Sequence, residues 1–97
     1  MNGKFKLGTV VATPGALRVL KDAGQEAGHF LALHVSGAWG DLDREDRQAN
    51  EEAIAREGNP ELQQRVLSSY VTRSGVKIWI ITEHDRSVTT ILLPDEY

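Results

Sequence analysis

The chain has no cysteine, few aromatic residues and no long apolar run. Zero cysteines in 97 residues exclude disulfides, thiolate metal sites and cysteine nucleophiles. No window approaches the roughly 20 apolar residues that a membrane-spanning helix needs. The first six residues also lack the apolar core of an export signal. We therefore expect a cytoplasmic protein with no membrane contact.

Motifs for cofactors and metals are missing too. The sequence holds no phosphate-binding loop, dinucleotide fingerprint, nucleophile elbow or calcium loop. None of His29, His34 and His84 stands at the i,i+4 or His-x-His spacing of paired metal ligands. His34 with Asp41 or Asp46 could approach a hard ion, but polar contacts at a helix end are the favoured use of His34. We expect no cofactor and no metal.

The sequence also lacks a cluster of Lys and Arg residues. The net charge is −3, and residues 41–61 hold eight acidic and three basic residues, so this segment carries −5 and the remainder +2. A duplex DNA ligand is disfavoured, because its phosphates call for a stripe of Lys and Arg. The acidic segment is either a solvated helix surface, which is the favoured interpretation, or a face that meets a basic partner.

What is present predicts a single α+β domain over residues 1–97. Residues 5–13 are rich in β-branched side chains, which indicates a short strand. Thr13 followed by Pro14 is typical of a helix start, and Gly24 is expected to stop this helix near residue 23.

Two further helices are expected before the chain changes character. The second has Gln25 and Glu26 in its first turn and ends near Gly37. The third is capped by Asp43 and ends at residues 58–60, a Gly-Asn-Pro sequence. Its thin apolar stripe places it on the surface.

From Leu62 the apolar pattern alternates, which predicts a three-stranded antiparallel meander under the helices. The strands are expected near residues 64–73, 76–82 and 87–93. If Ser74-Gly75 is a two-residue turn, Tyr70 lies opposite Trp79. If the second loop runs over residues 83–86, Trp79 lies opposite Thr90.

This register assigns one face of the sheet to the core and leaves an aromatic row on the other. The expected core residues are Leu67, Val71, Val76, Ile78, Ile80, Ile91 and Leu93. The row of Tyr70, Trp79 and Thr90 is either a stacking or anchoring platform or a face covered by helices. Its apolar neighbours Ile81, Val88 and Leu92 favour the covered alternative.

Two polar segments are the other candidates for function. In Trp39-Gly40-Asp41 the indole either plugs the core, which is favoured, or anchors a partner. Glu83, His84 and Arg86 share one loop and offer an acid, an imidazole and a cation.

Neighbouring residues of an extended loop point in different directions, so these three side chains are not expected to converge on one site. The favoured interpretation of this loop is a solvated turn that an Asp85 to Ser87 hydrogen bond closes.

The motifs also carry a resemblance. The segment GTVVATPG at residues 8–15, His34 ahead of Trp39-Gly40-Asp41, and residues 78–94 resemble an uncharacterised family of small bacterial proteins found on chromosomes, plasmids and other mobile elements. The resemblance covers nearly the whole chain. It implies no catalytic residue, and it raises the expectation of a role in plasmid or phage biology.

Three functional hypotheses follow, and a non-enzymatic protein-interaction module comes first. Its binding residues would be Tyr70, Trp79, Thr90, Trp39 and Asp41. Its partner would be another protein or a second copy of the chain, bound at a sheet edge or at the aromatic face.

The second hypothesis is a small metal-independent ribonuclease of toxin type, because helices followed by an antiparallel sheet resemble such toxins. Its catalytic residues would be Tyr70, Glu83, His84 and Arg86. The third is an acidic inhibitor of a DNA-processing protein that uses residues 41–61.

Overall fold

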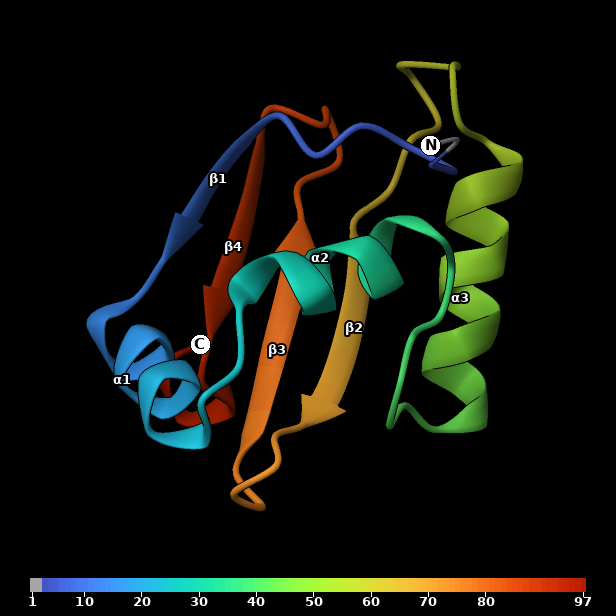
Figure 1. Cartoon of the computed structure of the whole chain (residues 1–97). Helices are drawn as coiled ribbons and strands as arrows, with labels where there is room; N and C mark the ends of the chain where they lie inside the picture. Colours follow the sequence, from blue (N-terminus) through green and yellow to red (C-terminus); the bar gives the residue numbers. More distant parts are fainter. Residues whose placement is uncertain (1–2) are drawn as a thin grey trace.

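The computed structural model describes residues 3–97, which form an α+β fold, as expected (Figure 1). Its elements are β1 (Thr9–Ala12), α1 (Pro14–Ala23), α2 (Ala27–Val35), α3 (Arg44–Ala55), β2 (Val66–Val71), β3 (Lys77–Thr82), β4 (Val88–Leu92) and the 3-10 turn η1 (Pro94–Glu96). None of the helices in this described part combines the length and apolar character needed to cross a lipid bilayer.

Local sequence signals set the helix ends, and the predicted caps are confirmed. The Thr13 hydroxyl accepts a hydrogen bond from the Ala16 N–H at 3.1 Å, which satisfies a free amide at the start of α1. The Asp43 carboxylate does the same for the Asp46 N–H at 2.8 Å in α3. Gly24 ends α1 in the left-handed conformation at φ 65°.

The sheet has four strands in the order β1-β4-β3-β2, so the predicted three-stranded antiparallel sheet is wrong. The segment from β2 to β4 is antiparallel, but β1 joins β4 in parallel and makes the sheet mixed. Pairing with β1 satisfies the N–H and C=O groups along the outer side of β4, which would otherwise lack partners in the fold. A parallel partner far away in sequence leaves no turn signal.

The first hairpin turns through three residues where two were predicted. The Thr72 N–H donates to the Val76 carbonyl at 2.9 Å, and the Gly75 N–H donates to the Thr72 carbonyl at 2.8 Å. Gly75 supplies the left-handed φ of 82° that a three-residue hairpin loop needs.

The extra residue moves the side chains of β2 to the opposite faces. Tyr70 pairs with Ile78, and Ser69 pairs with Trp79. Because side chains alternate along a strand, a shift of one residue inverts every assignment on one strand relative to the other. Tyr70 and Trp79 therefore lie on opposite faces, and the predicted row of Tyr70, Trp79 and Thr90 is wrong.

The second hairpin differs from prediction by two positions, which preserves the faces. Trp79 pairs with Leu92, and Ile81 pairs with Thr90, so the predicted pair of Trp79 and Thr90 is displaced. The Glu83 N–H bonds to the Val88 carbonyl at 3.0 Å, which leaves residues 84–87 as the loop. A shift by an even number keeps Trp79 and Thr90 on one side.

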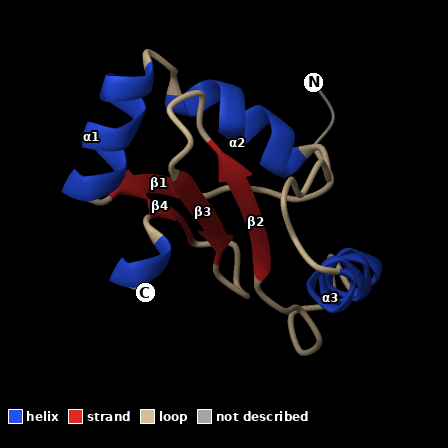
Figure 2. Cartoon of the chain, turned by 90° about the horizontal axis from the view of Figure 1, so that it is seen from below, coloured by secondary structure: helices blue, strands red, loops and turns tan. Residues whose placement is uncertain are grey.

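The helices α1 and α2 cover one face of the sheet, and the main core lies beneath them (Figure 2). The buried members of this core are Ala16, Leu20, Phe30, Tyr70, Ile78, Ile80 and Ile91. The prediction is confirmed for Ile78, Ile80 and Ile91. It is wrong for Val71 and Val76, which are 51% and 41% exposed, and for Leu67, which lies on the other face.

The third helix lies beside β2 and not on a face of the sheet (Figure 2). A second apolar cluster of Phe5, Trp39, Ala53 and Val66 fills the space between them. Asn50 of α3 binds the Leu67 backbone with both ends of its amide, at 2.6 Å and 3.0 Å. The contact of α3 with the sheet is thus partly apolar and partly through β2 backbone groups.

The face opposite α1 and α2 carries Leu67, Trp79, Ile81, Thr90 and Leu92, and we call it the Trp79 face. Within residues 3–97, η1 and Tyr97 are what lies over it, near the end where β4 leaves the sheet. This face is therefore only partly covered.

Candidate functional site

An apolar hollow on the Trp79 face is the first part of the candidate site. It has a volume of about 340 Å³ and is lined by Arg65, Leu67, Trp79, Ile81 and Tyr97. The strand register produces this lining, because Leu67 pairs with Ile81 and all strand residues of one parity share a face. The walls can receive an apolar side chain from another molecule.

Tyr97 and Arg65 form the rim of this hollow. The rings of Trp79 and Tyr97 meet edge to face, with centroids 5.9 Å apart. The Arg65 guanidinium donates to the Tyr97 hydroxyl at 2.7 Å and to the Glu83 carboxylate at 3.0 Å. The hydrogen bond and charge of Glu83 raise the pKa of Arg65. Glu83, one of the predicted catalytic residues, is thus used at the rim.

An acidic hollow of about 440 Å³ adjoins the apolar one, and Leu67 and Trp79 belong to both. Its polar lining includes three carboxylates and one ammonium group, namely Asp41, Asp43, Asp46 and Lys77. Asp41 and Lys77 form an exposed ion pair at 3.2 Å. After that pairing, the hollow keeps a negative excess close to the indole of Trp79.

The predicted binding residues divide between this site and the core. Trp79, Thr90 and Asp41 belong to the Trp79 side of the sheet. Tyr70 lies under the helices, where its hydroxyl donates to the Ala38 carbonyl at 2.6 Å and burial raises its pKa. Trp39 is buried in the second cluster, and its indole N–H donates to the carboxylate of Glu51 at 3.0 Å.

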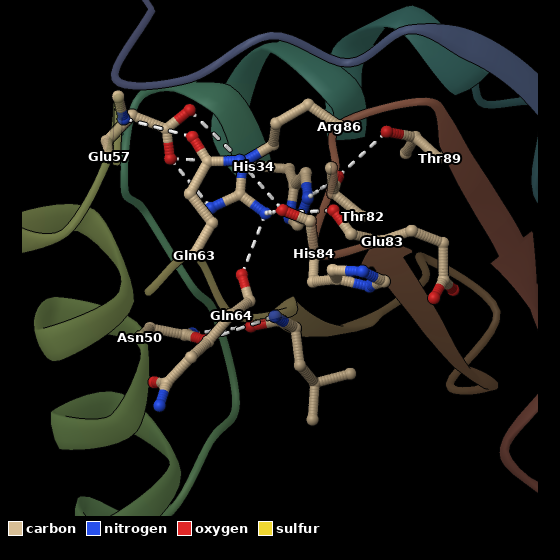
Figure 3. Close-up of polar contacts among 12 residues, drawn as sticks. His34, Asn50, Glu57, Gln63, Gln64, Thr82, Glu83, His84, Arg86 and Thr89 are labelled. Atoms are coloured by element: carbon tan, nitrogen blue, oxygen red, sulfur yellow. Dashed lines mark hydrogen bonds and ion pairs between the residues drawn. The ribbon is translucent and has the colours of Figure 1, made fainter. Parts of the chain in front are cut away.

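The remaining predicted catalytic residues do not converge, as Figure 3 shows. The Arg86 guanidinium faces Glu57, to which it donates at 2.7 Å and 3.0 Å, and it also binds the Gln64 and Glu83 carbonyls. The His84 side chain is exposed, and its backbone carbonyl accepts a hydrogen bond from Gln63.

A hollow of about 810 Å³ lies beside the ion pair of Arg86 and Glu57. Its lining includes the two cations Lys4 and Lys6 and the two carboxylates Glu57 and Asp85. The expected hydrogen bond from Ser87 to Asp85 is confirmed, so that carboxylate is also engaged. Both carboxylates of this hollow are thus engaged, Glu57 by Arg86 and Asp85 by Ser87.

A buried series of hydrogen-bonded side chains runs from α2 to the N-terminal segment, and no sequence pattern indicates its length. His34 contacts the Ser68 hydroxyl through Nδ1 at 2.5 Å and the Thr82 hydroxyl through Nε2 at 2.9 Å. Thr82 then meets Thr89 at 2.7 Å, and Thr89 donates to the Leu7 carbonyl at 2.7 Å. The expectation of satisfied polar contacts for His34 is confirmed.

The Leu7 carbonyl, the last acceptor of this hydrogen-bond series, determines the tautomer of His34. A carbonyl can only accept a hydrogen bond, so the Thr89 hydroxyl donates its proton to the Leu7 carbonyl. The Thr82 hydroxyl must then donate to Thr89, and the Nε2–H of His34 donates to the Thr82 oxygen. Nδ1 is then an acceptor for the Ser68 hydroxyl. Burial and the positive charge of Arg86 lower the pKa of His34 to about 3, which keeps the imidazole neutral.

The hydrogen-bond series is closed to solvent, since His34, Ser68, Thr82 and Thr89 are all 0% exposed. Its role is to hold α2 on the sheet. Among residues 3–97, no group of three or more His, Asp or Glu side chains is arranged to hold a metal ion.

Sequence reasoning missed Leu67, Arg65 and Tyr97 as site residues. Leu67 was assigned to the core because of the one-residue register error. Tyr97 had no sequence signal, because only the turn η1 brings its ring to Trp79.

Comparison with known proteins adds no relative: no protein-family model, no curated protein and no solved structure matches this chain.

Proposed function

We propose that this protein is a non-enzymatic protein-interaction module that binds its partner at the Trp79 face. The observation that carries the proposal is the position of Trp79, a half-buried indole between an apolar hollow and an acidic one. Tryptophan is enriched among residues that dominate binding energy, because its large rigid ring is desolvated at a small entropic cost.

The lining of the two hollows indicates the chemistry of the partner. The apolar hollow suits a Leu, Met or aromatic side chain, since Leu67, Ile81 and Trp79 supply its walls. The acidic hollow suits a Lys or Arg close to that side chain, because Asp41 and Asp46 face it. We therefore infer a protein segment with an apolar anchor flanked by basic residues.

The resemblance to proteins of mobile elements supports a place for this binding in plasmid or phage biology. The ribonuclease and acidic-inhibitor hypotheses stay predictions. The separate environments of Tyr70, Glu83 and Arg86 do not favour the ribonuclease hypothesis.

Selection from a random peptide display library on the immobilised protein tests the proposal. We expect enriched peptides that combine an apolar residue with Lys or Arg, and loss of binding by at least about thirtyfold in Trp79→Ser, as for a typical hot spot. Leu17→Ser is the matched control, because Leu17 is an exposed apolar residue of α1 on the other side of the sheet. It should bind as the parent protein does.

Two results would contradict the proposal. One is a selection that enriches no peptide family. The other is equal binding by the parent protein and a folded Trp79→Ser variant, which would move the binding surface away from the Trp79 face.

A further inference from the structure

The two edges of the sheet are finished in different ways. At the β2 edge, the Ser69 N–H donates to the Trp39 carbonyl at 3.0 Å, and the Ser69 carbonyl accepts from the Asp41 N–H. The Asn50 side chain binds both backbone groups of Leu67. The outward backbone groups of Leu67 and Ser69 are therefore occupied by the protein itself. An edge covered in this way cannot template another strand.

The β1 edge has no such cover among the described residues, since β1 is the terminal strand of the sheet and no element lies on its outer side (Figure 1). The Thr9 N–H donates at 2.9 Å to the carbonyl of Ser87, the residue before β4, and the Thr13 N–H donates at 3.0 Å to the Ile91 carbonyl of β4. Backbone direction alternates along a strand, so Val10 and Ala12 turn their N–H and C=O groups away from the sheet.

Side chains leave this edge unprotected as well. Val10 and Val11 are 42% and 44% exposed. Residues 7–17 include no charged residue, although 26% of the whole chain is charged. Natural edge strands usually carry a lysine, a proline or a bulge that prevents pairing. The four residues of β1 have none of these, and the short length of the strand is its one protection.

We propose that β1 pairs antiparallel with β1 of a second copy of this chain, across a two-fold axis at Val11. In this register Val10 of each copy lies opposite Ala12 of the other. Each such pair exchanges two hydrogen bonds, so the four outward N–H groups of the dimer all find an acceptor. One surface serves both copies, as a two-fold axis requires.

Shape and charge both allow this arrangement. Because the two β1 strands run in opposite directions, the α1 helices of the two copies lie at opposite ends of the β1–β1 interface. The paired strands carry no charge that would oppose this contact, since residues 7–17 include no charged residue.

The dimer would also join the two Trp79 faces. Register places Leu67, Ile81, Thr90 and Val11 in one row across the sheet. Pairing at Val11 continues that row into the second copy, so the eight strands form one sheet with the helices of both copies on the same side. The inference does not depend on the proposed partner, since it concerns the edge and not the face.

Sedimentation equilibrium of the full chain from about 10 μM to about 1 mM tests the dimer, because a seam of four residues is small and implies weak association. Val10→Pro removes only an outward N–H and leaves the bonds of β1 to β4 in place. It should raise the dissociation constant about thirtyfold, since two hydrogen bonds are lost per dimer. Val10→Thr keeps the N–H and should dimerise as the parent does.

Amide hydrogen exchange of the unmodified protein gives a readout that needs no variant. Thr9, Val11 and Thr13 bond to β4 and should be protected at every concentration. The amides of Val10 and Ala12 should gain about tenfold protection between dilute and concentrated samples. A monomer throughout the range, or a dimer in which Val10 and Ala12 gain no protection, would overturn the proposal.

Discussion

Acidification should destabilise this fold through one residue, His34. Its pKa in the folded protein is about 3, below the ordinary value of 6.5. The unfolded chain therefore takes up a proton near neutral pH and the folded chain does not. Stability from this group is complete above the ordinary pKa and is lost as the pH falls toward the folded value. Between about pH 7 and about pH 5 the free energy of unfolding should fall by about 2 kcal/mol.

Other groups contribute little in this window. Hydrogen bonds from Ser87 and Thr13 lower the pKa values of Asp85 and Glu96 below ordinary values of 3.8 and 4.5. Their stabilisation is present above those ordinary values and is lost mainly below about pH 5. The interval just below neutral pH therefore isolates His34.

Urea unfolding followed by tryptophan fluorescence at the two pH values measures the effect. In His34→Gln, whose amide still has a donor and an acceptor but does not titrate, the loss between the two pH values should shrink below about 0.5 kcal/mol. His84→Gln is the control, since His84 is exposed, and it should keep the parent's loss. An equal loss in parent and His34→Gln would refute the reasoning.

Two further predictions each compare a substitution at a closely packed position with the same substitution at a less constrained one. Arg86→Ala should lower the free energy of unfolding by about 3–5 kcal/mol, because it leaves the Glu57 carboxylate without its partner; Arg65→Ala breaks an exposed ion pair and should cost much less. A mild Arg86 variant would contradict the role of the pair. Gly40→Ala should cost more than Gly75→Ala in the same urea assay, although both glycines have positive φ, because a Cβ at Gly40 collides with the Ser69 carbonyl and one at Gly75 meets open space. An equal loss in the free energy of unfolding for both variants would show that strand β2 shifts at little cost to make room for the added Cβ.

Three helix-end signals were predictable because their causes are local, whereas α3 ends at Ala55, short of the predicted residues 58–60, and α2 begins at Ala27, after the predicted Gln25 and Glu26. Thr13, Gly24 and Asp43 act on backbone groups within a few residues, so the pattern contains all that is needed. The assignment of Ile78, Ile80 and Ile91 to the core was also within reach, because an even register shift at the second hairpin does not change which face a residue occupies.

The first hairpin shows where local reasoning stopped. A loop of two residues and a loop of three both fit the sequence around Ser74-Gly75, and the difference decides the face of every β2 side chain. The chosen length buries the Tyr70 ring against Phe30, with centroids 5.4 Å apart, and lets its hydroxyl reach Ala38. These partners lie far away in sequence, so the preference between the two loops is a property of the packed fold.

The sequence by itself determined the α+β class, the helix-end signals at Thr13, Gly24 and Asp43, and the alternation of the strands, since these depend on residues close to one another in the chain. Only the tertiary structure decided that β1 joins β4, that Tyr70 is buried while Trp79 borders two hollows, and that Tyr97 reaches Trp79. Each of these depends on contacts between distant segments, where burial of apolar rings and satisfaction of backbone groups outweigh local turn preference.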